Sequence, residues 1–271
     1  MRWLVALCFA FSLPSLAAAQ ADEIQVYDGG LAARGTFNLT LHNNFIARGL
    51  KTPAFEGAVT AHQSWNGVPE FALGVTTWFE AGLYLPLYSR DKDMGFGLDG
   101  LKLRALFAAP NGDERRFVYG ANFEFSYNAK RWDTTRITSE IRPIIGWHLK
   151  KMDIILNPII DTAYDGFGKL EFVPSVRVAW TVAPRLQVAV EEYANFGHVD
   201  DFLSRKEQSH QIYAVVDHAG KTWDIELGVG FGLTGESDKL TFKMILARDL
   251  KTRKAKLNAV AVPRTSGRRS R

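Results

Sequence analysis

Residues 136–162 read RITSEIRPIIGWHLKKMDIILNPIIDT, and this stretch decides the fold. Apolar and polar side chains alternate with a period of two on both sides of the dipeptide Lys150-Lys151. Such alternation is typical of β-strands, whose successive side chains point to opposite faces. The stretch therefore predicts a β-hairpin with a very short turn. One face of that hairpin is apolar, and it carries Ile137, Ile141, Ile145, Trp147, Met152, Ile154, Leu156 and Ile160.

The same alternation recurs from Gly35 to about Leu250, and it predicts about twelve strands. We place them at residues 35–46, 59–76, 79–87, 97–108, 115–128, 136–149, 152–162, 170–181, 185–195, 211–217, 222–231 and 239–247. The connections alternate between long ones, such as residues 88–96 and 196–210, and short ones, such as Thr77-Trp78. Short turns at one end and long loops at the other are typical of a transmembrane β-barrel.

We therefore predict an all-β protein, a transmembrane antiparallel β-barrel with up-and-down topology over residues 35–250. A soluble β-sandwich also alternates, and it is the alternative fold. Four tryptophans beside predicted short turns favour the barrel, because aromatic residues gather at membrane interfaces. These interface aromatics are Trp78, Trp147, Trp180 and Trp223. Prolines within the predicted strands, Pro86, Pro143, Pro158 and Pro174, each remove a ladder hydrogen bond, so we expect bulges there.

The two ends of the chain differ from the predicted barrel. Residues 1–21 have a basic start, an apolar run and a small-residue stretch, which is the layout of a secretory signal peptide. Residues 22–34 follow as a predicted periplasmic N-terminal leader. Residues 251–271 form a predicted basic, disordered C-terminal tail. The single cysteine, Cys8, lies in the predicted signal peptide, so the mature chain would hold no disulfide.

The basic net charge belongs to the C-terminal tail. The chain has 33 basic and 29 acidic residues, and eight of the basic ones lie in residues 251–271. Without those eight and Arg2, 24 basic residues face 29 acidic ones. We therefore expect no nucleic-acid partner, since the body of the protein is slightly acidic.

Charged residues on the polar strand face are the candidate functional residues, because that face would line the barrel lumen. They are Glu80, Lys102, Arg104, Arg116, Glu124, Glu140, Arg142, Asp153, Asp161, Glu171, Arg177, Glu191, Asp224, Glu226 and Lys243. They could line an open pore that selects by charge, or form a salt-bridged plug that stabilises the wall. The near-balance of signs argues against strong ion selectivity.

One segment carries a family resemblance. Residues 70–86 read EFALGVTTWFEAGLYLP, in which Gly74, Thr76, Glu80, Gly82 and Leu83 match a strand–turn–strand motif. The segment resembles a proteobacterial family of outer-membrane β-barrels labelled meta-pathway phenol-degradation or transporter-like proteins. Thr77 departs from the family pattern, which has an aspartate in that turn. The resemblance implies an outer-membrane barrel that moves small hydrophobic or aromatic compounds.

A second motif raises an enzymatic alternative. Residues 62–67 read HQSWNG, which is similar to an element of outer-membrane phospholipases, although Trp65 is inserted. His62 and Ser64 are two residues apart on one strand face, so His62 could activate Ser64 as a nucleophile. Both side chains would face the lumen, where a lipid ester would not arrive. We therefore expect a polar strand position and no catalytic, cofactor or metal site.

The sequence leads to one main hypothesis, a passive porin-like channel or uptake route for small molecules in the cell outer membrane. The alternatives are a non-conducting structural or partner-binding barrel and a lipid hydrolase using His62 and Ser64. We expect a monomer that contacts outer-membrane lipids and lipopolysaccharide. During biogenesis it would contact the barrel assembly machinery.

Overall fold

The structure is a computed structural model that describes residues 23–250. The predicted signal peptide, residues 1–21, and the predicted tail, residues 251–271, lie outside the described residues. The described part of the chain is built from β-strands and two short 3-10 helices, η1 (Gly112–Glu114) and η2 (Phe167–Lys169). Within it, no helix has the length and apolar character needed to cross a membrane.

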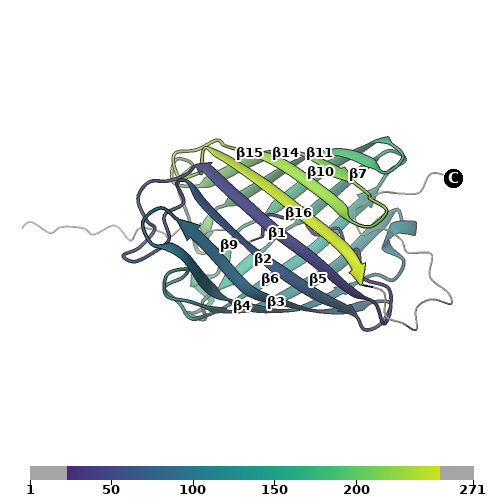
Figure 1. Cartoon of the computed structure of the whole chain (residues 1–271), viewed down its shortest axis with the longest axis horizontal. Helices are drawn as coiled ribbons and strands as arrows, with labels where there is room; N and C mark the ends of the chain where they lie inside the picture. Colours follow the sequence, from purple (N-terminus) through teal and green to yellow (C-terminus); the bar gives the residue numbers. More distant parts are fainter. Residues whose placement is uncertain (1–22, 251–271) are drawn as a thin grey trace, which may run out of the picture.

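The strands form one closed antiparallel barrel with twelve wall positions, which confirms the predicted fold class (Figure 1). β1 pairs with β2 on one side and with the last strand on the other, and this pairing closes the barrel. The first eight strands are β1 (Phe37–Arg48), β2 (Ser64–Gly74), β3 (Phe79–Asp91), β4 (Gly95–Ala108), β5 (Phe117–Asn128), β6 (Ile137–His148), β7 (Met152–Asn157) and β8 (Ile160–Thr162). The others are β9 (Glu171–Phe172), β10 (Ser175–Ala183), β11 (Leu186–Asn195), β12 (Gly197–His198), β13 (Asp201–Phe202), β14 (Ser209–His218), β15 (Asp224–Gly232) and β16 (Leu240–Leu250).

Prolines interrupt the wall where the sequence predicted irregularities. Pro158 lies between β7 and β8, and Pro174 lies between β9 and β10, so each splits one wall position into two short strands. At Pro86 the pairing of β3 with β4 shifts between Tyr84 and Leu87. Pro143 differs because it stays inside β6, opposite Ala121 of β5. Three of the four prolines therefore sit at breaks or register shifts, where the missing N–H costs no ladder bond.

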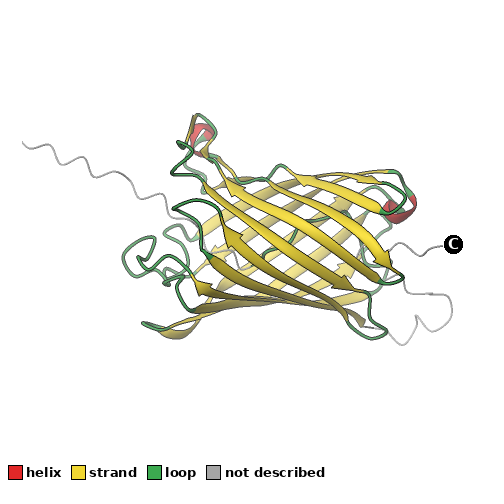
Figure 2. Cartoon of the chain, turned by 90° about the horizontal axis from the view of Figure 1, so that it is seen from above, coloured by secondary structure: helices red, strands yellow, loops and turns green. Residues whose placement is uncertain are grey.

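The connections separate into two ends of the barrel. We call the end with the turns after β2, β4, β6, β10 and β14 the short-turn end, and the opposite end the long-loop end. Figure 2 shows the longer loops gathered at the left, opposite the η1 turn. The prediction of a long connection at residues 88–96 is wrong, because β3 continues to Asp91 and β4 begins at Gly95. Strand pairing continues almost to the tip of that hairpin.

The polarity of the wall is inverted relative to a soluble protein. Large apolar side chains such as Phe71, Leu103 and Phe242 point outward and are 44%, 53% and 42% exposed. Charged side chains such as Glu70 and Arg104 alternate with them and are buried inside the barrel. Soluble proteins almost never bury so many charged groups. The fold therefore turns its polar face inward and leaves an apolar outer surface.

Aromatic residues mark the short-turn end of the outer surface. Trp78 stacks with Phe107 at a ring distance of 6.0 Å, and Trp147 lies 5.6 Å from Phe117. Trp180 lies near the end of β10, and Trp223, which precedes β15, lies 5.1 Å from the Arg248 guanidinium. All four predicted tryptophans thus occupy the short-turn end. Their role at a membrane interface stays a prediction.

Candidate functional site

The barrel interior is occupied by the start of the described chain. We call residues 23–34 the N-terminal segment. Its C-terminal end lies at the short-turn end of the barrel, where the Gly35 N–H donates to the Gly74 carbonyl. Ile24, Tyr27 and Ala32 are almost fully buried among inward-facing side chains of the wall. The sequence predicts a periplasmic leader at residues 22–34. The structure places residues 23–32 inside the lumen, where the wall offers them buried hydrogen-bond partners, and Ala33 and Arg34 are exposed.

Side chains from four wall positions hold the backbone of the N-terminal segment. Asn157 binds Tyr27 twice: it accepts from the Tyr27 N–H at 2.7 Å and donates to the Tyr27 carbonyl at 2.9 Å. Three further hydrogen bonds hold the backbone. Arg142 donates to the Gln25 carbonyl at 2.9 Å, Lys243 donates to the Ile24 carbonyl at 3.1 Å, and the Ala32 N–H donates to Glu80 at 2.6 Å. A strand-like segment inside a barrel has no ladder partner of its own, so these side chains satisfy its buried backbone groups.

Tyr27 is the central anchor of the N-terminal segment. Its hydroxyl lies 2.5 Å from the hydroxyl of Tyr84, and its ring packs with Leu106 and Ile144. The guanidinium of Arg142 lies 4.5 Å from the ring centroid, within the range of a cation–π contact. One aromatic residue thus combines an apolar contact, a hydrogen bond and a cation contact.

A first group of charges, the Arg104 network, surrounds Tyr27 on strands β1 to β4. Arg104 pairs with Glu70 at 2.6 Å and with Glu80. Glu70 also lies 3.2 Å from His42. A side chain at Gly82 would overlap the guanidinium of Arg104, so this glycine leaves room for the pair. The motif residues Glu80 and Gly82 therefore serve one ion-pair network.

A second group, the Lys243 network, crosses five neighbouring strands, β10, β11, β14, β15 and β16. Arg177 pairs with Glu191 and with Asp217. Lys243 pairs with Glu191 at 2.5 Å and with Glu226 at 2.6 Å. Each of the five side chains comes from a different strand, so the network links a continuous arc of the wall.

The structure places nearly all predicted lumen residues on the inner face. Arg142 binds Glu140 at 2.6 Å, Lys102 binds Glu124 at 3.4 Å, and Asp153 binds His148 at 2.7 Å. The other inward-facing members are Glu80, Arg104, Asp161, Glu171, Arg177, Glu191, Asp224, Glu226 and Lys243. Arg116 differs: it is exposed and precedes β5. Their role in solute passage stays a prediction.

Several interior residues were not among the predicted ones. Glu70 lies in the quoted family motif and has the same strand parity as Ser64, whose side chain is predicted to face the lumen, so this parity could have identified it. Asp217 follows Tyr213 and Val215 on the same inward face, so that face of β14 has no clear polar pattern. Asp28 and Glu23 lie outside every predicted strand. Polarity alone carried no signal that residues before the first strand would enter the lumen.

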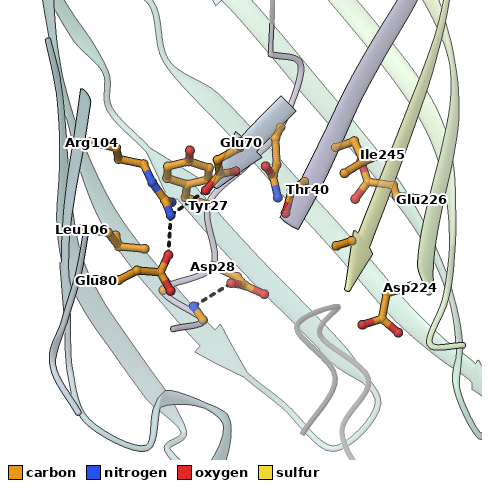
Figure 3. A pocket seen from close by; sticks show the side chains of 14 residues that line it. Tyr27, Asp28, Thr40, Glu70, Glu80, Arg104, Leu106, Asp224, Glu226 and Ile245 are labelled. Carbon is orange, nitrogen blue, oxygen red and sulfur yellow. Dashed lines mark hydrogen bonds and ion pairs between the residues drawn. The ribbon is translucent and has the colours of Figure 1, made fainter. Parts of the chain in front are cut away.

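The interior retains a small cavity of about 70 Å³ beside the N-terminal segment (Figure 3). Its walls come from the segment itself at Asp28, from β2, β3 and β4, and from β15 and β16. Figure 3 shows Arg104 directed at Glu70 and Glu80 on one side and Asp224 on the other side of the gap. The N-terminal segment therefore fills part of the lumen and leaves a polar space along one arc of the wall.

The His62 and Ser64 motif does not assemble into a catalytic site. The hydroxyl of Ser64 donates to the Ala61 carbonyl at 2.8 Å, so it is directed at the backbone and not at His62. Between residues 23 and 250 no three acidic, histidine or cysteine side chains are grouped in a way that could hold a metal ion. The interior features that bear on function are therefore its charged side chains and its cavity.

Comparisons with known proteins agree with this architecture. No family model matches the chain, and no curated protein matches it. Among solved structures, an outer-membrane channel from Pseudomonas putida F1 is 11% identical with a TM-score of 0.57, covering 84% of this chain and 100% of the channel. The porin KdgM, in complex with disordered oligogalacturonate, is 7% identical with a TM-score of 0.51, covering 79% of this chain and 99% of the porin.

At these identities the likeness shows a shared fold. The chain has the β-barrel fold of outer-membrane channels and porins. The phenol-degradation label of the family that residues 70–86 resemble is not confirmed by these comparisons, and it stays a prediction.

Proposed function

We propose that this protein is an outer-membrane barrel that serves as a passive, porin-like route for small molecules, narrowed by its N-terminal segment. The observation that carries the proposal is the inverted polarity of a closed barrel with a charged interior and a residual cavity. An apolar outer face suits lipid, and a polar lumen suits water and solute. The shared fold with an outer-membrane channel and a porin supports it. The family resemblance adds small hydrophobic or aromatic molecules as candidate solutes.

Conductance in a planar bilayer tests the proposal. We expect the purified full chain to give small, resolvable current steps, because the N-terminal segment leaves only part of the lumen open. Deletion of residues 23–33 removes the N-terminal segment except Arg34 and leaves β1 (Phe37–Arg48) intact, and it should raise the conductance severalfold. Slower migration of heated samples on detergent gels shows that both proteins are folded barrels. Absence of current from both proteins, with no solute entry into reconstituted vesicles, would contradict a channel.

The location and contacts follow from the same surface. The apolar outer face and the aromatic short-turn end support insertion in the outer membrane as a monomer, in contact with lipids and lipopolysaccharide. Assembly there would require the barrel assembly machinery. Cell fractionation tests this: we expect the protein in the outer-membrane fraction and its release only by detergent. Recovery in a soluble periplasmic fraction would contradict the proposed location.

The filled lumen favours a second candidate, a non-conducting barrel that stabilises the envelope or binds a partner through its loops. Four wall positions hold the N-terminal segment by hydrogen bonds, which is the arrangement expected of a permanent plug. The conductance experiment separates the two candidates. A silent full chain together with a conducting deletion variant would favour the plugged barrel.

A further inference from the structure

Carboxylates far outnumber cations on the inner surface. Between the two rims of the described barrel, the inward cations are Lys102, Arg104, Arg142, Arg177 and Lys243. The carboxylates of the same surface and of the N-terminal segment are Glu23, Asp28, Glu70, Glu80, Glu124, Glu140, Asp153, Asp161, Glu171, Glu191, Asp217, Asp224 and Glu226. The near-balance expected from the sequence is thus replaced by a marked acidic excess.

The cations are already engaged by part of these carboxylates. Arg104 faces Glu70 and Glu80, and the two cations of the Lys243 network face Glu191, Asp217 and Glu226. Lys102 and Arg142 each pair with a carboxylate as well. Pairing cancels at most one negative charge per cation. By formal charge, the carboxylates therefore still outnumber the cations after every pair is counted.

The cavity beside the N-terminal segment concentrates this excess. Five carboxylates line it, from Asp28, Glu70, Glu80, Asp224 and Glu226, and Arg104 is the cation of its lining (Figure 3). Asp28 accepts a bond from the uncharged Gly30 N–H at 2.8 Å. A small cavity with low-dielectric walls focuses the field of its lining charges. A solute in this space experiences a negative environment.

Glu23 adds a buried carboxyl group close to Glu70, which lines the cavity. Its side chain belongs to a residue that is only 8% exposed, and neither carboxylate oxygen has a hydrogen-bond partner in the described structure. Its electrostatic neighbours include Glu124 and Glu70, with His42 and Arg142. A carboxylate buried among other carboxylates is costly, and either protonation or a nearby positive charge relieves that cost. Glu70 also lines the cavity, so Glu23 lies next to a residue of the cavity wall.

We infer that the route past the N-terminal segment selects small cations, both alkali ions and small organic ammonium compounds, over anions. The inference rests on the proposed channel function and names its solute class. Carboxylate rings are a common means of cation selection in pores. Asp28, Asp224 and Glu23 are the residues assigned to this selection, because Asp28 and Asp224 line the cavity and Glu23 is buried close to Glu70, which also lines it.

The reversal potential of the full chain in a planar bilayer with a potassium chloride gradient tests the inference. We expect a potassium-to-chloride permeability ratio above about 3, as negatively lined pores favour cations. The triple variant Glu23→Gln, Asp28→Asn, Asp224→Asn should lower that ratio at least twofold. A matched control, Glu56→Gln, Glu114→Gln, Glu236→Gln, removes three exposed carboxylates outside the lumen and should keep the ratio.

Each outcome separates this inference from the channel itself. A ratio of one or less in the full chain would overturn cation selection and leave the channel intact. A triple variant with an unchanged ratio, folded by its migration on detergent gels, would overturn the assignment to these residues. Tetraethylammonium in place of potassium should carry measurable current, whereas an equal current from a sulfonate anion would contradict the inference. Absence of current from both the full chain and the 23–33 deletion would contradict the proposed channel function, and with it the cation selection that depends on it.

Discussion

The two charge networks of the lumen differ in what they hold. The Arg104 network has one guanidinium for two carboxylates, and it contacts the N-terminal segment through Tyr27 and the Ala32 N–H. The Lys243 network has two cations for three carboxylates, and its contact with the segment is the bond from Lys243 to the Ile24 carbonyl. The first network therefore positions the segment, and the second mainly joins strands of the wall.

This difference suggests that a barrel can separate wall stability from lumen occupancy. The wall between β10 and β16 includes short strands and small inward residues such as Ala179, Ala189 and Gly228. Small residues bury little area, so charge pairs across this arc contribute more of its cohesion. On the β1 to β5 side, long strands supply that cohesion, and the charges are available to hold Tyr27.

The largest expected effect is on the wall, in Arg177→Met. This change removes the cation paired with Asp217 and leaves Glu191 with Lys243 alone, and removing one partner of a buried ion pair costs about 3–5 kcal/mol. We expect unfolding at lower urea concentration in detergent or lipid, followed by tryptophan fluorescence, with the N-terminal segment still docked. Arg185→Met, at the short-turn end of the same arc, is the control. An unchanged unfolding midpoint would show that the Lys243 network does not stabilise the wall.

The next effect concerns the segment, in Tyr27→Ala. Loss of the ring removes its packing on Leu106 and Ile144 and its contact with Arg142, and truncation of a buried aromatic residue costs about 3 kcal/mol. We expect faster hydrogen exchange in residues 23–34 and a larger conductance, with the unfolding midpoint of the wall nearly unchanged. Phe167→Ala, at a position that is 83% exposed, provides the matched aromatic control. A drop in wall stability equal to that of Arg177→Met would contradict the separation of roles.

The sequence predicted the wall well because a period of two is a strong, repeated signal. The predicted strand at residues 115–128 is observed as Phe117–Asn128, and the predicted strand at 185–195 as Leu186–Asn195. The sequence did not show which prolines would interrupt a strand. Pro158 and Pro174 break their strands, whereas Pro143 is accommodated within β6. The difference depends on the pairing with the neighbouring strands. The residue type restricts hydrogen bonding, but the register of the neighbouring strand is set by the whole barrel.

The interior was less predictable than the wall. Inward side chains such as Arg104, Arg177 and Glu191 follow from strand parity, which is local. The pairing of Arg177 with Asp217 depends on which strands become neighbours after a 40-residue separation along the chain. The docking of Tyr27 depends on a partner 130 residues away, Asn157. A segment without periodicity carries no local sign that the lumen will take it up.

A smaller effect is expected for Asn157→Ala. This variant removes both hydrogen bonds between the side chain and the Tyr27 backbone, each contributing about 1 kcal/mol. We expect the Tyr27 region to exchange its amide hydrogens faster than in the wild type, but less than in Tyr27→Ala. Asn44→Ala, which removes an inward asparagine bonded to Asn66, is the control for loss of a luminal amide. Exchange equal to that of the control would mean that these bonds do not hold the segment.

The smallest effect sharpens the role of the Tyr27 hydroxyl, in Tyr27→Phe. The variant keeps the ring, its apolar contacts and its contact with Arg142, and loses the 2.5 Å bond to the Tyr84 hydroxyl and the longer 3.4 Å bond to Glu124. A hydrogen bond of this kind contributes about 1 kcal/mol, so the population of the undocked segment should rise roughly fivefold. We expect that increase in hydrogen exchange of residues 23–34, with Tyr119→Phe on the outer face as the control. Release as complete as in Tyr27→Ala would place the anchor in the hydroxyl pair, whereas the wild-type exchange rate would place it entirely in the ring. We expect an intermediate exchange rate because both the ring and the hydroxyl of Tyr27 contact side chains of the wall.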